Sequence, residues 1–219
     1  MSKTFKTINP ATEESIKEYT FMSDAEAKQA VEDCHEAFLN WKFTSFEERA
    51  NKLKAIAVEF KKNKQELVEL MTKEMGKLTS QGEQEIDLCI SICKYTAENG
   101  ADSLKDEQRT LPNGGKGLIT YSPLGVIYGI QPWNFPTYQV IRYAIANIMA
   151  GNGVLLKHAE NVTGSGLMIE KILKDAGLPE NLFKVVLVDH DQSDDIIDND
   201  LVRGVTFTGS PSGGRTIAK

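Results

Sequence analysis

GIQPWNFPTYQVIRYAIANIMAGNGVLLKHAE, residues 129–160, is the stretch that decides the fold of this chain. It begins with Trp-Asn-Phe between Pro132 and Pro136, continues as an apolar helical pattern over 137–150, and ends in a short apolar run over 153–157. A helix followed by a strand that is apolar throughout is typical of a parallel sheet, because both faces of such a strand are covered. The stretch therefore predicts one helix–strand unit of an α/β fold.

The same alternation continues toward the end of the chain. The pattern predicts a helix over 163–176, which ends at Gly177 with Pro179 beyond it, as helix termini usually do. We therefore predict an α/β fold with a Rossmann-like parallel sheet of three short strands and helices on both faces. The remaining predicted elements are a strand over 183–188, a helix over 192–199, a strand over 204–208 and a last helix within GSPSGGRTIAK.

The first half of the chain has helical periodicity. Ser23 with Glu26 three residues later is a capping box, which predicts the start of a helix. Ser45 with Glu48 repeats that pattern at the start of a second helix, and Asn63 marks a break in the apolar stripe that follows. This half is therefore predicted to be mainly helical.

Three parts of the chain are distinguished by these patterns. Residues 1–117 are predicted to form an N-terminal helical part, and residues 118–130 a hairpin or arm around Pro123. A proline suits an edge or an arm better than a central strand, because it cannot donate a hydrogen bond to a neighbouring strand. Residues 131–219 are predicted to form an incomplete parallel α/β part.

The composition excludes several classes of protein. Of the 219 residues 41% are hydrophobic and 26% are charged, and the net charge is −6, which is ordinary for a globular protein and argues against a nucleic-acid binder. The N-terminus lacks the apolar run of a secretory signal, and no apolar stretch is long enough for a membrane span. A cytoplasmic location is therefore expected.

The three cysteines do not predict a metal site. Cys34, Cys89 and Cys93 lack metal-ligand spacing. Cys89 and Cys93 stand four residues apart on a predicted helix, so they share a face. We expect all three to be buried as small hydrophobic residues, and no metal is predicted.

Lys157 and Glu160 lie where a parallel sheet binds its ligands, at the carboxyl end of a predicted strand. There a lysine and a carboxylate could hydrogen-bond the hydroxyls of a ribose. The carboxylate would also repel a 2′-phosphate, which slightly favours NAD over NADP. A surface ion pair between Lys157 and Glu160 is the alternative.

Gly209 and Ser210 form a second candidate site, at the turn between a strand and the last helix. The backbone N–H groups and the hydroxyl at such a turn could bind a pyrophosphate. An ordinary strand-to-helix turn uses the same residues, and the G-x-G-x-x-G fingerprint is absent.

Asn134 is the candidate for catalysis. A side-chain amide held between two prolines is suited to stabilise a developing oxyanion, because a fixed dipole needs no reorganisation in the transition state. A polar turn residue that satisfies local backbone groups is the alternative.

In order and spacing, several motifs resemble the aldehyde dehydrogenase superfamily over essentially the whole chain. They are INPATEE near the N-terminus, EMGK at 74–77, SPLGV at 122–126, PWNFP at 132–136, the Lys-x-x-Glu pair at 157–160 and FTGS at 207–210. The resemblance implies oxidation of an aldehyde to a carboxylic acid, with NAD or NADP as the cofactor, by way of a cysteine nucleophile.

The resemblance implies that residues 1–117 are the N-terminal helical part of a cofactor-binding domain and that residues 131–219 are its incomplete dinucleotide-binding part. It also implies roles for individual residues. Asn134 would be the side-chain donor of the oxyanion hole, and Lys157 with Glu160 would hold the adenosine ribose. Gly209 and Ser210 would hold the pyrophosphate. The residues implied to line the cofactor cleft are Ile130, Gln131, Pro132 and Trp133.

Arg142 indicates the substrate. It lies two helical turns after Asn134 in an otherwise apolar helix, where a charge is expected to have a partner. In the succinate-semialdehyde branch of the family an arginine at the matching position binds the distal carboxylate of the substrate, as a guanidinium fork can. A salt bridge to an acidic neighbour is the alternative, and so is an aldehyde dehydrogenase of another specificity.

The chain departs from the family at its end. The motifs that carry the nucleophilic cysteine and the general-base glutamate are absent from these residues, so we expect the catalytic domain to be missing and the chain alone to be inactive. Either the chain is a fragment of a complete enzyme, or it is a non-catalytic nucleotide-binding or interaction module. An open sheet edge and the 118–130 hairpin predict a homo-oligomer. At Asp189-His190-Asp191, where relatives have small residues, the acids could weaken phosphate contacts or face solvent.

Overall fold

The computed structural model describes residues 3–218, so residues 1, 2 and 219 of the predicted parts 1–117 and 131–219 lie outside the described residues. A parallel sheet lies at the centre, in the order β7-β6-β5-β8. Its strands are β5 (Val126–Gln131), β6 (Gly153–His158), β7 (Phe183–Val185) and β8 (Val202–Phe207). The predicted α/β class with a Rossmann-like parallel sheet is confirmed.

One strand of this sheet was not predicted. We predicted a hairpin or arm over 118–130, but β5 lies between β6 and β8 in the parallel sheet. Pro123 does not prevent this, because the strand begins only at Val126, and Val126, Ile127 and Tyr128 are buried. The sheet therefore has four strands rather than the predicted three.

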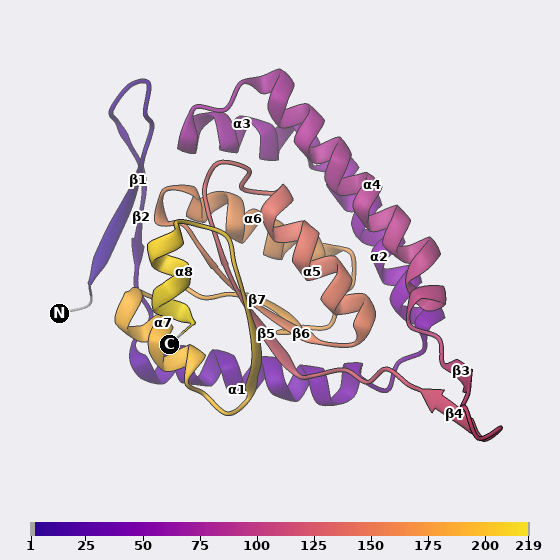
Figure 1. Cartoon of the computed structure of the whole chain (residues 1–219). Coiled ribbons are helices and arrows are strands. Elements are labelled where there is room, and N and C mark those ends of the chain that lie inside the picture. Colours follow the sequence, from indigo (N-terminus) through magenta and orange to yellow (C-terminus); the bar gives the residue numbers. More distant parts are fainter. Residues whose placement is uncertain (1–2, 219) are drawn as a thin grey trace.

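The hairpin lies earlier in the chain than predicted. β3 (Glu107–Thr110) pairs antiparallel with β4 (Lys116–Ile119), and the chain reverses between them where Leu111 N–H donates to Gly115 O at 2.8 Å. Figure 1 shows this hairpin extending away from the body of the molecule.

The N-terminal half is an antiparallel pair, β1 (Thr4–Ile8) with β2 (Ser15–Thr20), followed by four helices. The helices are α1 (Asp24–Trp41), α2 (Phe46–Lys62), α3 (Lys64–Met75) and α4 (Thr79–Ser103). Ser23 and Glu26 form the predicted capping box. The Ser45 hydroxyl accepts from the N–H of Glu48 and so caps α2. Among the described residues, the Glu48 side chain does not accept from the N–H of Ser45, so the capping box is only half formed there. Asn63 separates α2 from α3, as predicted.

The helices form layers on the two faces of the sheet (Figure 1). α5 (Tyr138–Ala150) and α6 (Thr163–Asp175) cover one face, with α2, α3 and α4 packed outside them. α1 and α7 (His190–Ile197) cover the other face. Successive residues of β6 serve both cores, because Val154 and Leu156 join the first and Leu155 the second.

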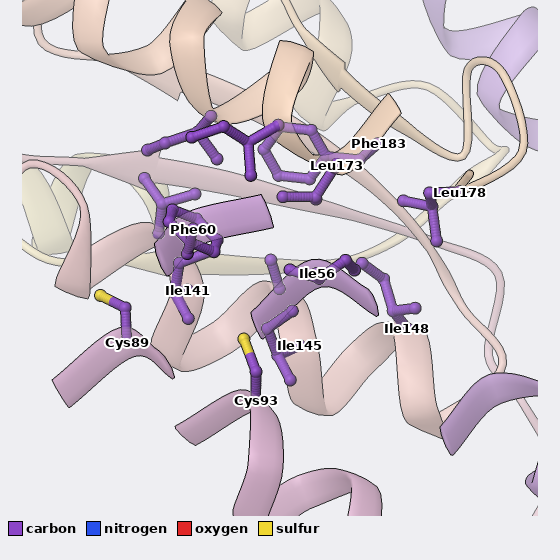
Figure 2. Close-up of a cluster of buried hydrophobic side chains, with 14 of the residues drawn as sticks. Ile56, Phe60, Cys89, Cys93, Ile141, Ile145, Ile148, Leu173, Leu178 and Phe183 are labelled. Carbon is purple, nitrogen blue, oxygen red and sulfur yellow. The ribbon is translucent and has the colours of Figure 1, made fainter. Parts of the chain in front are cut away.

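The larger core joins the N-terminal helices to the sheet layer. Cys89 and Cys93 are buried there and Cys34 is buried in the smaller core, as predicted for small hydrophobic residues. Figure 2 shows members of the larger core from α2, α4, α5, α6 and the segment around β7 converging on one another: Ile56, Phe60, Cys89, Cys93, Ile141, Ile145, Ile148, Leu173, Leu178 and Phe183.

A close contact fixes α5 against β5. The Tyr143 hydroxyl donates to the Leu155 carbonyl at 3.2 Å, and a Cβ at Gly129 would lie 2.1 Å from the Tyr143 ring. Only glycine leaves room for this ring. α5, and with it the loop that precedes it, is therefore held in a defined position on the sheet.

Several predicted boundaries shift by a few residues. β7 ends at Val185 rather than 188, and α7 begins at His190 rather than 192, because Asp189 caps it. A short 3-10 helix, η1 (Glu160–Val162), precedes α6, and α8 (Pro211–Ile217) follows β8. Within residues 3–218 no helix combines the length and the apolar character that crossing a membrane would require.

Candidate active site

A cavity of about 410 Å³ opens at the carboxyl ends of the parallel strands β5, β6 and β8. Its remaining walls come from α7 and α8. The volume lies within the range of small-molecule and cofactor sites, and the location is the one where open parallel sheets bind ligands. This cavity is therefore the candidate cofactor site.

The cavity brings together residues from three distant parts of the sequence. The sequence-predicted site residues that line it are Ile130, Gln131, Pro132, Lys157, Gly209 and Ser210. Trp133, Asn134, Arg142 and Glu160 are not part of this lining. Parallel pairing explains the convergence, since Ile130 is paired with Lys157 on one side and with Phe207 on the other.

Lys157 is buried at the base of the cavity, with 9% of its surface exposed. Burial lowers its pKa, and the negative charges of Glu160 and Asp189 counteract that shift. Among the described residues no protein atom accepts a hydrogen bond from Lys157 Nζ. The alternative of a surface ion pair between Lys157 and Glu160 is therefore not found as a direct contact among the described residues. The ammonium group of Lys157 is available to a ligand.

The turn from β8 into α8 forms the opposite wall. Ser210 Oγ accepts from the N–H of Gly213 at 3.1 Å and lies 3.0 Å from Ser212 Oγ, so the hydroxyl caps α8. A Cβ at Gly209 would meet the Phe207 ring at 2.4 Å. Glycine is therefore required for the ring to lie under the turn, and the turn leaves Gly209 and Ser210 exposed at the cavity.

α7 contributes polar groups to the cavity, and of these the sequence had indicated only the region of His190. His190, Ser193 and Asp194 line the cavity. Ser193 is buried, and its hydroxyl lies 2.9 Å from that of Tyr128, which ties α7 to β5. No motif marks Ser193 and Asp194, because the wall exists only once the helix packs on the sheet.

Asp189 is occupied by other contacts. Its carboxylate accepts from Lys3 Nζ at 2.9 Å and from the N–H of Gln192 at 3.1 Å, as the cap of α7. The ion pair with Lys3 and these bonds lower the pKa of Asp189. Of the Asp-His-Asp run, His190 is the residue that reaches the cavity lining.

Asn134 lies in the exposed loop between Pro132 and Pro136. Its Oδ1 accepts from the N–H of Phe135 at 3.1 Å, which orients the amide. Within residues 3–218 its Nδ2 group makes no hydrogen bond, so the donor side of the amide is free. The bond to Phe135 is the kind of contact expected if Asn134 were only a polar turn residue that satisfies local backbone groups. It occupies the amide oxygen, however, and leaves the Nδ2 group available as a donor.

Buried groups support this loop from below. Lys77 Nζ donates to the Asn134 carbonyl oxygen at 2.9 Å and forms an ion pair with Glu85. His158 Nε2 lies 2.8 Å from the Pro136 carbonyl oxygen, so this nitrogen carries the proton. Sequence spacing could not reveal these supports, because each comes from a separate element.

Arg142 is exposed rather than directed into the core. Positions 141 and 143 are buried, and the arginine occupies the outer stripe of α5 between them. Its Nη2 donates to Thr208 Oγ1 at 3.3 Å, and the guanidinium lies 5.9 Å from the Tyr138 ring centre. In the described part of the chain it has no carboxylate within ion-pair distance, so the alternative of a salt bridge is not found. Thr208 lines the cavity, which places Arg142 at its border.

Comparison with known proteins identifies relatives over the whole chain. The aldehyde dehydrogenase family model matches residues 1–219. The chain is 35% identical over 215 residues to a succinate-semialdehyde dehydrogenase of Deinococcus radiodurans that is named for NADP(+), and 37% identical over 210 residues to one of Escherichia coli named for NAD(P)+. These matches cover 98% and 96% of this chain and 45% of each relative.

A solved structure is similar throughout the described fold. The succinic semialdehyde dehydrogenase of Streptococcus pyogenes, in complex with NADP+, superposes with a TM-score of 0.94 at 31% identity. The match covers 98% of this chain and 47% of that one. The chain thus spans about half the length of the relatives that it matches.

Proposed function

Because the chain belongs to the aldehyde dehydrogenase family, we propose that it is the cofactor-binding half of an NAD(P)-dependent enzyme that oxidises succinate semialdehyde to succinate. The observation that carries the proposal is the cavity at the carboxyl ends of β5, β6 and β8, with Lys157 on one side and the Gly209–Ser210 turn on the other. The Deinococcus radiodurans and Escherichia coli relatives are named as succinate-semialdehyde dehydrogenases, which supports this substrate.

The residues of the cavity fit an adenine dinucleotide. Lys157 offers an ammonium group without a protein acceptor in the described residues, at a place suited to ribose hydroxyls. The exposed turn at Gly209 and Ser210 offers polar groups to a pyrophosphate. When bound, the nicotinamide supplies the acceptor for the hydride that leaves the substrate.

Asn134 and Arg142 would act on the substrate. The free Nδ2 of Asn134 would donate to the aldehyde oxygen as it becomes negatively charged, and its fixed orientation makes that interaction effective. The exposed guanidinium of Arg142 would bind the distal carboxylate of succinate semialdehyde. The attacking thiol is proposed to come from a part of the enzyme outside these residues, since Cys34, Cys89 and Cys93 are all buried.

The proposal includes a preference for NAD over NADP. Glu160 acts electrostatically on Lys157, so a ribose bound there would have this carboxylate nearby. A 2′-phosphate would be repelled by the carboxylate of Glu160. NADP appears in the names of several relatives, so this preference would distinguish the chain from them.

Calorimetric titration of this chain with NAD and with NADP tests the site. NAD should bind more tightly, and Lys157→Met should weaken its binding by about tenfold to a hundredfold, which corresponds to one hydrogen bond to a charged group. Glu160→Ser should bring the two dissociation constants closer together.

Glu180→Ser is the matched control, because it removes an exposed carboxylate that pairs with Lys174 away from the cavity. It should change neither dissociation constant. Failure of both nucleotides to bind would contradict the cofactor site. Tighter binding of NADP than NAD would contradict only the preference.

A further inference from the structure

We propose that Lys77 and Glu85 form a buried clamp whose task is to position Asn134, and the inference rests on the function proposed above. The two residues stand at the junction of α3 with α4 and on the first turns of α4. They therefore belong to the N-terminal helical layer, far in sequence from the loop that they contact. The clamp would make that layer part of the active site.

Lys77 holds the loop at Asn134 itself. Its Nζ donates to the Asn134 carbonyl oxygen at 2.9 Å and lies 3.9 Å from the centre of the Phe135 ring. The side chain is only 4% exposed. An ammonium group in this position restrains the backbone carbonyl of Asn134 and the side chain of the next residue, Phe135.

Glu85 fixes the far end of the same loop. Its Oε1 accepts from the N–H groups of Thr137 and Tyr138, each at 2.8 Å, and so caps α5 from outside the chain segment. α5 has no side-chain cap of its own at Thr137. A carboxylate at a helix N-terminus is favoured by the helix dipole, and here it anchors the helix that continues the loop.

The ion pair between Lys77 and Glu85 joins the two anchors. The Glu85 side chain is fully buried and that of Lys77 nearly so. Burying two charges is costly, and stability alone is often served as well by apolar residues in such places. Both charged groups donate to or accept from backbone groups of one short segment, residues 134–138. This arrangement indicates that the pair serves to keep that segment rigid. The amide of Asn134 is the group in that loop that needs a fixed direction.

Nuclear magnetic relaxation on this chain tests the clamp without any assumption about catalysis. In the wild type the backbone amides of Asn134 and Phe135 should have order parameters of about 0.85, and in Lys77→Met they should fall below about 0.6. Lys64→Met is the matched control, since Lys64 pairs with Asp87 of α4 on the surface and touches no part of the loop. Order parameters that stay unchanged in Lys77→Met would overturn the proposal.

A double-mutant cycle in the complete enzyme tests the positioning role. Lys77→Met should lower kcat by about tenfold to a hundredfold, the effect of a small misplacement of a reacting group, and leave the KM for the nucleotide within about twofold. Asn134→Ala should lower kcat by about a hundredfold or more. If Lys77 acts through Asn134, the double variant should be no slower than Asn134→Ala alone. Additive losses would overturn the proposal.

The outcomes separate the clamp from the proposed function. An Asn134→Ala enzyme with unchanged kcat would contradict the oxyanion role, while the order parameters would still decide whether the clamp exists. If Lys77→Met does not fold, the neutral pair Lys77→Met with Glu85→Gln replaces it, because no unpaired buried charge remains. That pair should also lose order at Asn134, and an ordered loop there would overturn the proposal.

Discussion

His158 shows at the scale of one residue how the site loop depends on a buried group. Its imidazole lies between the end of β6 and the loop, where Nε2 donates to the Pro136 carbonyl and Nδ1 accepts from the Ala159 N–H at 3.0 Å. Burial lowers the pKa of His158 to about 4, so the ring is neutral at neutral pH. The loop is therefore supported by a neutral donor as well as by the charged Lys77.

The pKa of His158 predicts a dependence of stability on pH. In the unfolded chain the ring has its ordinary pKa of 6.5, so between pH 6.5 and about 4 the unfolded state binds a proton that the folded state does not. The stability is present above pH 6.5 and is lost as the pH falls through this window, by about 3 kcal/mol for a shift of this size. Urea unfolding at pH 7.5 and pH 4.5 measures the loss.

The variant His158→Gln isolates this effect from the titration of carboxylates. It keeps a donor for Pro136 but has no titratable ring, so its stability should fall less between the two pH values. His190→Gln, at an exposed position, should behave as the wild type does. Equal losses in His158→Gln and the wild type would show that the ring of His158 is not responsible.

At the same scale, the sequence identified only part of the candidate site. Asn134, Lys157 and Gly209 stand in local motifs next to predicted strands, so their neighbourhood could be inferred. Lys77 stands in the EMGK motif, but the contact of Lys77 or of Glu85 with the Asn134 loop could not be found in that way. Their partners lie more than fifty residues away, and a lysine or glutamate on a helix ordinarily faces solvent.

At the scale of elements, a buried carboxylate from the N-terminal layer also caps α6. Glu74 at the end of α3 accepts from the N–H groups of Gly164 and Ser165 at 2.7 and 2.9 Å, and from Ser165 Oγ at 2.7 Å. Burial raises the pKa of Glu74, while these hydrogen bonds act in the opposite direction. Glu85 of α4 caps α5 in the same way. Both helices that cover this face of the sheet are therefore capped at their N-termini by a carboxylate from the outer helical layer.

We predict that Glu74→Ala lowers the free energy of unfolding by about 2–3 kcal/mol, because buried N–H groups at the start of α6 lose their acceptor. The amide of Gly164 should exchange with solvent much faster. Glu66→Ala, an exposed position on the same helix, should change the stability by less than about 0.5 kcal/mol. Similar losses in the two variants would show that the cap does not stabilise the fold.

The elements themselves were predicted best where the pattern was local. The helix breaks and the strands at 153–157 and 204–208 follow from periodicity and capping residues, and the structure places strands there. β5 was misplaced because VIYGIQ follows a proline and a glycine, so it was joined to the hairpin before it. Its central position depends on pairing with β6 and β8, and pairing partners are not encoded in the strand itself.

At the scale of the whole molecule, the β3–β4 hairpin and the segment after it expose apolar side chains. Leu111, Leu118, Ile119, Tyr121 and Leu124 are each between 44% and 66% exposed. An apolar projection of this kind is suited to contact a second subunit. The homo-oligomer expected from the sequence would therefore assemble through residues 107–124 rather than through 118–130.

We predict that Leu118→Lys with Ile119→Lys weakens self-association by about tenfold or more, since each exposed apolar side chain loses its burial in the contact. Sedimentation velocity over a range of concentrations measures the change. Leu88→Lys is the control, because Leu88 is 47% exposed on α4 and lies away from the hairpin. An unchanged distribution of sedimentation coefficients in the hairpin variant would exclude the hairpin as the contact.

The three buried thiols have a practical consequence for the whole molecule. Burial raises the pKa of Cys34 and of Cys93 to about 12, so neither forms a reactive thiolate while the fold is closed. Cys34 belongs to the core beneath α1, and Cys93 to the core beneath α4. The rate at which Cys34 is alkylated therefore reports how often the smaller core opens, and the rate for Cys93 reports how often the larger core opens. Local unfolding of the two cores can thus be measured separately in the native chain.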